Sequence, residues 1–288
     1  MTNVGLIGLG YWGTKYAKVL QSMGDVNLVS ICKRSIKGYS QENMIFTIDI
    51  DDILYDENID CVIVATPAST HTKIAEQCIN AGKHALIEKP FTITSQAARD
   101  LIEMNAEKKL VIMPGHIYLH HSGIKKLKEL IDFEVKNIFS KRMSLSKYPD
   151  ALGEVALHDI YILQYLFGDI SEIKSVMGNK KHCISNLRIN DTEIYVESST
   201  DYPGKIREMI IRGENKRLIF DEADKDYITV TDLNTKVVDF VKYDISKSPL
   251  ELQCEHFFNC VKGKETPIVN EHSGLYTVEI IEQLHKLL

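Results

Sequence analysis

The segment Glu88-Lys89-Pro90 places one lysine directly after a short apolar run. The proline fixes the local backbone and keeps Lys89 out of a helix, because the residue before a proline avoids the helical region. If the apolar run is a strand of an open parallel sheet, its carboxyl end faces the place where such folds bind ligands. Lys89 could then donate a charge-assisted hydrogen bond to a substrate oxygen. An ordinary surface lysine in a turn is also compatible with this position.

A second pair of residues with possible chemistry, Glu154 and His158, is spaced at i and i+4. In a helix this spacing places both side chains on one face. Histidine exchanges protons near neutral pH, and a positioned general acid or base contributes about 100- to 10,000-fold to a rate. The same spacing also describes an exposed helical pair without a catalytic role, so the residues alone leave both interpretations open.

The N-terminal stretch has the order of features that is typical of dinucleotide binding. An apolar segment runs into Gly8-x-Gly10-x-x-Gly13, and helix-forming sequence follows. Glycines let the backbone approach a pyrophosphate, and the N-terminus of the following helix offers N–H groups and a positive dipole end. Tyr11 and Trp12, inside this loop, are expected to pack beside the cofactor rather than react.

The elements that must position these residues alternate over residues 1–117. Short apolar runs that are unbroken indicate strands buried on both faces, which means a parallel sheet covered by helices. The expected strands are Val4–Gly8, Val26–Cys32, Cys61–Ala65, His84–Glu88 and Leu110–Met113, with helices at Tyr11–Ser22, Thr70–Ala81 and Ser95–Lys108. Residues 1–117 are therefore predicted to form a dinucleotide-binding Rossmann domain.

The remaining chain, residues 118–288, has a different character. After a helix near Glu154–Phe167 it becomes a series of strand-like segments separated by turn residues, among them Pro203-Gly204. This pattern predicts a mostly antiparallel open sheet built from hairpins, in an α+β domain for substrate binding and oligomerisation. The expected strands are Val135–Ser144, Glu193–Ser199, Lys205–Arg212, Lys216–Asp221, Tyr227–Asp232 and Val237–Tyr243. The final helix, residues 273–288, is a candidate to pack back on the Rossmann domain.

The composition argues against several classes of function. The chain of 288 residues has a formal net charge of −6 and a pI near 5.9, which argue against a nucleic-acid platform, because that needs clustered basic surface. No stretch of about 18 uninterrupted apolar residues is present, so no membrane span is predicted. The six cysteines are scattered and form no C-x-x-C pair, which fits a reducing cytoplasm. We therefore expect a cytoplasmic protein that binds neither nucleic acid nor membrane.

The end of the second expected strand bears on the choice of cofactor. NAD sites place an acid there for the ribose 2′-OH, whereas NADP sites use basic residues. Here Lys33-Arg34-Ser35 follows the strand, and the first carboxylate comes at Glu42. Two cations and a hydroxyl suit a 2′-phosphate, so the sequence favours NADP(H) over NAD(H). A solvated basic turn that discriminates neither is the alternative.

Several stretches together resemble the glucose–fructose oxidoreductase, inositol dehydrogenase and rhizopine-catabolism family (Gfo/Idh/MocA). They are Gly5–Gly13, Ala65-Thr66-Pro67 with His71, Ala81–His84 leading to Glu88-Lys89-Pro90, Leu157–Ile160, and the closing segment from Glu255 to Pro267. The resemblance covers essentially the whole chain, and Glu-Lys-Pro at this distance from the glycines is a specific feature. Because the chain is shorter than many members, a trimmed second domain is expected.

The resemblance implies an activity and roles for named residues. In that family the lysine of Glu-Lys-Pro and a histidine of Asp-x-x-x-His are active-site groups. Lys89 and His158 are therefore expected to be catalytic, with Glu154 at the place usually held by aspartate. The implied reaction transfers a hydride between NAD(P) and a secondary alcohol or ketone carbon of a sugar or nucleotide-linked sugar. A homo-oligomer formed through the C-terminal sheet is implied as well.

The expected binding residues lie at or after the carboxyl ends of the strands. Those for the cofactor are Gly8, Gly10, Tyr11, Trp12, Gly13, Lys33, Arg34, Ser35, Thr66, Pro67, His71, Glu88 and Lys89. His116 and Tyr118, which follow the last Rossmann strand, are expected to line the substrate pocket. No metal site is predicted, because no carboxylate lies at a suitable spacing from the histidines that follow the last Rossmann strand.

Two other functions remain compatible with the sequence. Some similar proteins hold NAD tightly and cleave glycosides by transient oxidation without net redox change, and others regulate transcription without catalysis. The Lys33-Arg34 turn disfavours the first, because exchangeable NADP(H) suits net reduction. The presence of both Lys89 and His158 disfavours the second.

Overall fold

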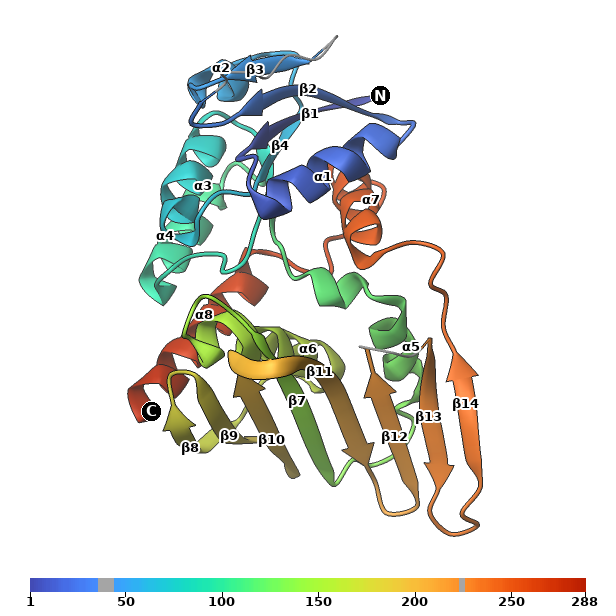
Figure 1. The fold of residues 1–288 in the computed structure, drawn as a ribbon. Coiled ribbons are helices and arrows are strands. Elements are labelled where there is room, and N and C mark those ends of the chain that lie inside the picture. The colour runs from blue at the N-terminus through green and yellow to red at the C-terminus, as the bar shows by residue number, and fades with distance from the viewer. Residues whose placement is uncertain (36–43, 223–225) are drawn as a thin grey trace. The chain divides into compact units, whose positions relative to one another are not determined.

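The computed structural model describes residues 1–35, 44–222 and 226–288, and the chain divides into two compact units (Figure 1). Unit 1 comprises Met1–Ile117 and Leu250–Glu279, and unit 2 comprises Tyr118–Pro249 and Ile280–Leu288. Each unit contains its own sheet. Among the described residues, no helix is both long and apolar enough to cross a bilayer.

The sheet of unit 1 is parallel and has the strand order β3-β2-β1-β4-β5-β6. This order, with two halves on either side of the first strand, is that of a Rossmann domain, so the predicted fold class is confirmed. The strands are β1 (Thr2–Ile7), β2 (Val26–Cys32), β3 (Ile45–Thr47), β4 (Cys61–Val64), β5 (His84–Ile87) and β6 (Ile112–Pro114). The three-residue strand β3 was not predicted, because so short a run carries no recognisable period.

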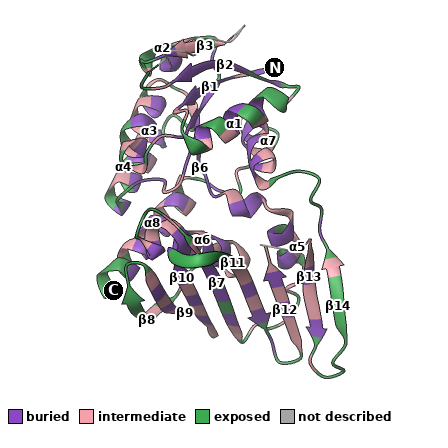
Figure 2. Ribbon diagram, viewed as in Figure 1, coloured by how far each residue is buried: buried purple, intermediate pink, exposed green. Residues whose placement is uncertain are grey.

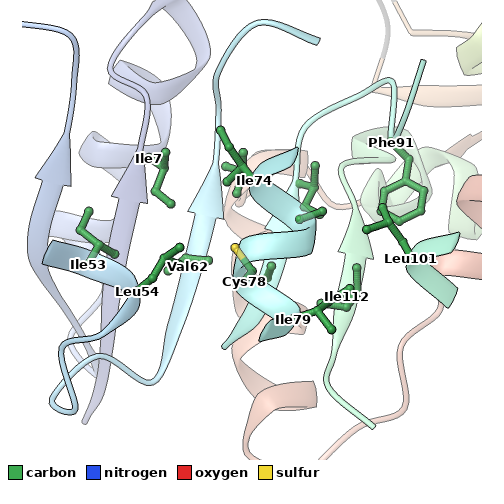
Figure 3. Close-up of a cluster of buried hydrophobic side chains, with 14 of the residues drawn as sticks. Ile7, Ile53, Leu54, Val62, Ile74, Cys78, Ile79, Phe91, Leu101 and Ile112 are labelled. Atoms are coloured by element: carbon green, nitrogen blue, oxygen red, sulfur yellow. The ribbon is translucent and has the colours of Figure 1, made fainter. Parts of the chain in front are cut away.

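Helices cover both faces of this sheet, with α3 and α4 on one side and α1 and α7 on the other (Figure 1). Figure 3 shows the buried cluster on the face of the sheet that carries α3 and α4, and Val62, Ile74 and Leu101 are among its members. The helical segments are α1 (Tyr11–Ser22), α2 (Asp51–Leu54), η1 (Ala68–Thr70), α3 (His71–Asn80), α4 (Ser95–Asn105) and α7 (Pro249–Val261). Burial of these apolar faces fixes the carboxyl ends of the strands, where the candidate residues lie.

The last helix, α8 (Glu271–Leu287), contributes residues to both units. Its beginning packs on α4 of unit 1, where the Asn105 side chain donates to Glu271 at 2.9 Å and Arg99 forms an ion pair with Glu279. Gly274 lies so close to Phe91 that an added Cβ would come within 2.7 Å of its ring. The start of α8 is therefore an integral part of the Rossmann unit.

The sheet of unit 2 has the order β14-β13-β12-β11-β7-β10-β9-β8, and only the β7–β10 pairing is parallel among the described strands. Its strands are β7 (Asn137–Leu145), β8 (Glu172–Asn179), β9 (His182–Ile189), β10 (Thr192–Ser199), β11 (Asp201–Arg212), β12 (Lys216–Asp221), β13 (Tyr227–Asp232) and β14 (Val238–Lys242). Buried and more exposed residues alternate along these strands (Figure 2), as expected for a sheet with one covered face. The prediction of a mostly antiparallel sheet is confirmed.

The helical segments of unit 2 are η2 (Ile117–His120), α5 (Ser122–Leu130), η3 (Leu152–Ala156) and α6 (Leu157–Phe167). Helix α5 packs against β12 and β13, and η3 packs against β7 and β10. These helices carry Tyr118, Glu154 and His158, three of the residues singled out by the sequence.

Two local expectations for unit 2 were wrong. Pro203-Gly204 does not separate two strands, because both residues lie inside β11, where the register with β7 shifts between Asp201 and Lys205. A bulge accommodates proline within a sheet, so turn-forming residues did not signal a turn here. The helix expected from Glu154 to Phe167 is also not uniform, since its start, Leu152–Ala156, is a π-helix.

Candidate functional site

The glycine loop of unit 1 is shaped by two close backbone contacts. Gly8 has φ +100°, and a Cβ there would lie 2.6 Å from the carbonyl oxygen of Ala65. A Cβ on Gly13 would lie 2.0 Å from the Gly8 carbonyl oxygen. Only glycine fits either position, because it tolerates positive φ and has no side chain to clash.

Gly10 differs from these two glycines. Within the described part of the chain, no heavy atom other than those of Gly10 and its two chain neighbours lies within 4 Å of the position that its Cβ would occupy. Helix α1 begins at the next residue, and its first intrahelical bond runs from the Thr14 N–H to the Gly10 carbonyl at 2.9 Å. The N–H groups of the first turn are therefore those that no helical carbonyl can satisfy. Open space before a helix N-terminus fits the pyrophosphate of a dinucleotide.

Lys15 adds a cation to this loop that the sequence interpretation missed. Its Nζ lies 4.4 Å from the ring centroid of Tyr11 and 4.7 Å from that of Trp12. The ammonium group lowers the pKa of Tyr11 through a hydrogen bond and its charge. The i, i+4 spacing of Tyr11 and Lys15 on α1 was the signal that could have revealed the contact.

The basic turn after β2 lies directly beside the glycine loop. The Gly8 N–H donates to the Cys32 carbonyl at 2.9 Å, and the Lys33 N–H donates to the Thr47 carbonyl at 3.0 Å. Lys33 is half-buried, whereas Arg34 and Ser35 are exposed. Glu42, the first carboxylate after the turn, lies outside the described residues.

His71 links the loops that follow β4 and β5. Its Nδ1 lies 2.7 Å from the Pro90 carbonyl oxygen and its Nε2 lies 3.0 Å from the Thr66 carbonyl oxygen. The side chain is 1% exposed, and burial lowers its pKa. The Thr70 hydroxyl also donates to the Thr66 hydroxyl at 2.7 Å. This network joins Thr66, beside the exposed Pro67, to the carbonyl of Pro90.

Glu88 anchors the main chain of Lys89. Its carboxylate accepts a hydrogen bond from the Tyr16 hydroxyl at 2.9 Å and another from the Lys89 N–H at 3.1 Å. Glu88 and Tyr16 are both buried, and burial raises the pKa of Glu88. The Lys89–Pro90 peptide bond is cis, and the Lys89 side chain is half-buried. Helix α1 and strand β5 thus together hold the backbone from which the Lys89 side chain extends.

In unit 2, His158 lies between two tyrosines. Its Nδ1 is 2.8 Å from the Tyr161 hydroxyl, and its ring meets the Tyr118 ring edge-on at a centroid distance of 4.9 Å. Tyr161 and Tyr118 are buried, while His158 is half-buried. The Tyr118 N–H donates to the Tyr161 hydroxyl oxygen at 3.4 Å. Buried groups therefore hold the imidazole at two places, at Nδ1 and at its edge-on contact with the Tyr118 ring.

A buried charge network lies behind these rings. Arg142 on β7 pairs with Asp159 at 3.2 Å and with Glu222 at 3.3 Å, and Arg207 pairs with Glu222 at 2.5 Å. The guanidinium carbons of Arg142 and Arg207 lie 4.4 and 5.3 Å from the Tyr118 ring centroid. Burial opposes ionisation of Glu222, but Arg142 and Arg207 outweigh it and hold the pKa of that carboxyl below its usual range.

The two residues expected to line a substrate pocket are both largely buried. His116 is 1% exposed, and burial lowers its pKa to about 3, so the imidazole is neutral at physiological pH. Tyr118 is 8% exposed. Across residues 1–35, 44–222 and 226–288, no three His, Cys, Asp or Glu side chains gather as metal ligands would.

The family model described as "Oxidoreductase family, NAD-binding Rossmann fold", GFO_IDH_MocA, matches residues 2–116. The Rossmann part of this chain is therefore similar to the Gfo/Idh/MocA family. The resemblance drawn from the glycine loop and the Glu-Lys-Pro segment is thereby confirmed, and with it an NAD-binding fold of an oxidoreductase family.

Proteins similar to this chain include UDP-N-acetylglucosamine 3-dehydrogenase from Acidithiobacillus ferrooxidans, which is 31% identical over 57% of this chain and 54% of its own length. The aligned part thus spans about half of that relative. The solved structure named UDP-N-acetylglucosamine 3-dehydrogenase GnnA from the same organism has a TM-score of 0.90, at 20% identity over 99% of this chain and 97% of that one. KijD10, a 3-ketoreductase from Actinomadura kijaniata solved with TDP-benzene and NADP, has a TM-score of 0.85, at 16% identity over 99% and 97%. Both structures show that the two-sheet fold extends over the whole chain.

Glu154 and His158 lie in two successive helical segments of different type. Glu154 lies in the π-helix η3, where its N–H donates to the Asp150 carbonyl at 3.0 Å, whereas His158 lies in the α-helix α6. The two residues therefore do not lie in one regular α-helix, and the placement of Glu154 beside His158 stays a prediction.

Proposed function

We propose that this protein is an NAD(P)-dependent oxidoreductase that transfers a hydride to or from a secondary alcohol or ketone carbon of a sugar or nucleotide-linked sugar. The observation that carries the proposal is the fixed main chain of Lys89 at the carboxyl end of β5, held by the buried Glu88 carboxylate in the same unit as the glycine loop. Ligands bind at this edge in open α/β sheets. The relative named UDP-N-acetylglucosamine 3-dehydrogenase supports the substrate class.

The chain's own residues suit such a cofactor. The first turn of α1, next to Gly10, would bind the pyrophosphate, and Thr66, Pro67, His71 and Glu88 would support or line the same edge. When bound, the nicotinamide ring takes or gives the hydride. We infer that Lys33, Arg34 and Ser35 bind a 2′-phosphate, which makes NADP(H) the preferred cofactor.

Fluorescence titration with NADPH and NADH tests this preference. Arg34→Asp should weaken NADPH binding by about tenfold to a hundredfold, because it replaces a charge-assisted hydrogen bond with repulsion. Lys18→Ala, on the exposed side of α1, is a control that should change neither affinity. NADH bound at least as tightly as NADPH by the unaltered protein would remove the NADP(H) preference and leave the oxidoreductase proposal intact.

We assign complementary roles to the two candidate catalytic groups. The Lys89 ammonium holds the substrate oxygen as its negative charge rises or falls, and His158 gives or takes the proton of that oxygen. Glu154 is assigned to the same site as a polar contact, and His116 and Tyr118 as supports of the substrate pocket. A general acid or base of this kind contributes about 100- to 10,000-fold.

The decisive experiment follows reduced-nicotinamide absorbance with a panel of nucleotide-linked sugars, sugars and inositols. Lys89→Met and His158→Gln should each lower kcat/KM by about 100-fold or more. Lys73→Met and His272→Ala, at exposed positions of α3 and α8, are matched controls that should keep full activity. Full activity of both site variants would overturn the mechanism. Product formed without any net absorbance change would identify redox-neutral glycoside cleavage instead.

We further propose that two copies of the chain associate through the outward face of the unit 2 sheet. An apolar row crosses it at paired positions of Tyr195, Phe139, Ile210 and Ile219. The Phe139 and Tyr195 rings stack at a centroid distance of 5.2 Å, and Phe139 is 42% exposed. The neighbouring row carries both charge signs in the Lys141–Glu197 ion pair, so the surface is complementary to a second copy of itself.

Light scattering after size-exclusion chromatography tests this association. Phe139→Lys should convert an oligomer into a monomer, because it introduces like charges at the centre of the apolar row. Ile48→Lys, at an exposed position of unit 1, should leave the assembly unchanged. A monomeric unaltered protein would contradict the proposal.

The six cysteines are buried free thiols, which suits a cytoplasmic location.

A further inference from the structure

The hydroxyl of Tyr161 makes a specific contact with His158 that the residue types alone did not suggest. Tyr161 is 1% exposed on α6, three residues after His158, and its hydroxyl lies 2.8 Å from the imidazole Nδ1. The Tyr118 N–H also donates to this hydroxyl oxygen at 3.4 Å. One oxygen therefore joins the histidine to the backbone of η2.

The hydroxyl is chemically suited to remain bonded to Nδ1 in both protonation states of the imidazole. Burial raises the pKa of Tyr161 well above its ordinary value, so the phenol keeps its proton. A phenol can donate to a bare nitrogen and can also accept from an N–H, because it has one proton and two lone pairs. Nδ1 is thus occupied whether or not it carries a proton.

The second support of the imidazole is the Tyr118 ring, which meets it edge-on at 4.9 Å. That ring is itself held by the guanidinium groups of Arg142 and Arg207, 4.4 and 5.3 Å from its centroid. Asp159 and Glu222 neutralise these cations. The imidazole therefore rests against a neutral, buried and rigidly paired surface.

We propose that Tyr161 is a positioning residue that holds Nδ1 of His158, so that Nε2 is the atom that exchanges a proton with the substrate oxygen. This inference rests on the proposed function for the role of His158. In the reducing direction, the Nε2–H of the imidazolium passes its proton to the substrate oxygen, while Nδ1–H remains and donates to Tyr161. In the oxidising direction, Nε2 takes the proton of the substrate hydroxyl and Tyr161 still accepts from Nδ1–H.

Tyr161→Phe tests the assignment, because it removes only the hydroxyl. We expect kcat to fall on the order of 10- to 100-fold with KM changed less than about threefold, since orientation rather than substrate binding is lost. Tyr165→Phe is the matched control, one turn later on α6, where the ring lies under the Lys128 ammonium at 3.7 Å. It should keep kcat within about twofold of the unaltered protein.

A second readout does not depend on activity. Long-range proton–nitrogen correlation spectra of histidine-labelled protein report which ring nitrogen carries the proton, and the His158 signals are assigned by their loss in His158→Gln. The unaltered protein and Tyr165→Phe should show one defined state with a bonded Nδ1. Tyr161→Phe should show a mixture of tautomers. If Tyr161→Phe does not fold, fluorotyrosine incorporated at position 161 changes the donor strength of the hydroxyl and should shift the Nδ1 resonance.

The outcomes separate this inference from the proposed function. An unchanged His158 spectrum and unchanged kcat in Tyr161→Phe would overturn the positioning role. A shifted spectrum with reduced kcat supports it. A shifted spectrum, while neither Tyr161→Phe nor His158→Gln affects turnover, would overturn the proton-exchange role of His158 although the Tyr161 contact exists.

Discussion

Lys89 directly follows the buried acid Glu88, and His158 directly precedes the buried acid Asp159. The groups that satisfy these two acids differ. Glu88 in unit 1 accepts from the neutral Tyr16 hydroxyl and from the Lys89 N–H. Asp159 in unit 2 is paired with the Arg142 guanidinium. Unit 1 thus fixes the main chain of its candidate residue with a carboxylate whose hydrogen-bond donors are an uncharged hydroxyl and an uncharged amide. Unit 2 fixes the ring of its candidate through aromatic groups that rest on a network of charges.

This difference has an energetic consequence. Removing one partner of a buried ion pair leaves an uncompensated charge, whereas removing a neutral donor leaves one acceptor unsatisfied, which costs less. Unit 2 should therefore be the more sensitive of the two to a single substitution. The predictions below test that ranking and begin with the largest expected effect.

Arg142→Met should have the largest effect on stability. It leaves Asp159 and Glu222 buried with less compensating charge, so the free energy of unfolding should fall by about 3–5 kcal/mol. Denaturant unfolding followed by circular dichroism measures this change. Lys126→Met, on α5 of the same unit, removes a cation paired with the exposed Glu129 outside the proposed association surface and should cost at most about 1 kcal/mol. Equal losses in the two variants would show that the buried network stabilises no more than a surface pair.

The sequence predicted the structure around the unit 1 candidate residues better than the structure around those of unit 2. The strand, the glycines and the helix are consecutive, so short-range spacing was sufficient to place Gly8, Gly13 and Lys89 at one edge of a sheet. Arg142, in contrast, finds Asp159 and Glu222 at 17 and 80 residues' distance in the chain. Pairing between such distant residues depends on strand register, which local patterns do not specify.

One feature of the sequence indicated the charge network, namely the position of Arg142 in the alternating pattern of its strand. Arg142 stands two residues after the buried Ser140 on β7, so the alternation of the strand makes it an inward-facing cation. An inward arginine requires an acid, and this rule could have pointed to a buried pair without naming the partner. The contact of Tyr161 with His158 was harder to predict, because a tyrosine in an apolar helix is typical of an ordinary core residue.

Tyr16→Phe should have a smaller effect, on the unit 1 side of the comparison. It removes one of the two donors to the buried Glu88 carboxylate, which should lower the free energy of unfolding by about 1–3 kcal/mol. Tyr11→Phe, on the same helix but 74% exposed, is the control and should leave stability unchanged. A loss for Tyr16→Phe as large as that for Arg142→Met would reverse the ranking of the two units.

The smallest effect, but the most specific, is a difference of sign in the pH dependence of two carboxyl groups. Burial raises the pKa of Glu88 in the folded state. The contribution of Glu88 to the free energy of unfolding is therefore fully present below its unfolded pKa of about 4.3 and is lost as pH rises through its folded pKa. Glu222 is the opposite case, because burial opposes its ionisation but Arg142 and Arg207 lower its pKa overall. The contribution of Glu222 to the free energy of unfolding is present above its unfolded pKa and is lost as pH falls through its folded pKa.

Glu88→Gln and Glu222→Gln convert this contrast into a measurement. The unfolding free energy of the unaltered protein minus that of Glu88→Gln should decrease as pH rises above about 4.3, because burial disfavours the charged carboxyl more than Tyr16 and Lys89 favour it. The same difference for Glu222→Gln should instead increase as pH rises through the acidic range, because the ionised carboxyl is what the two guanidinium groups bind. Parallel slopes for the two variants would mean that both acids are satisfied alike, and the distinction between a neutral and a charged support would not hold.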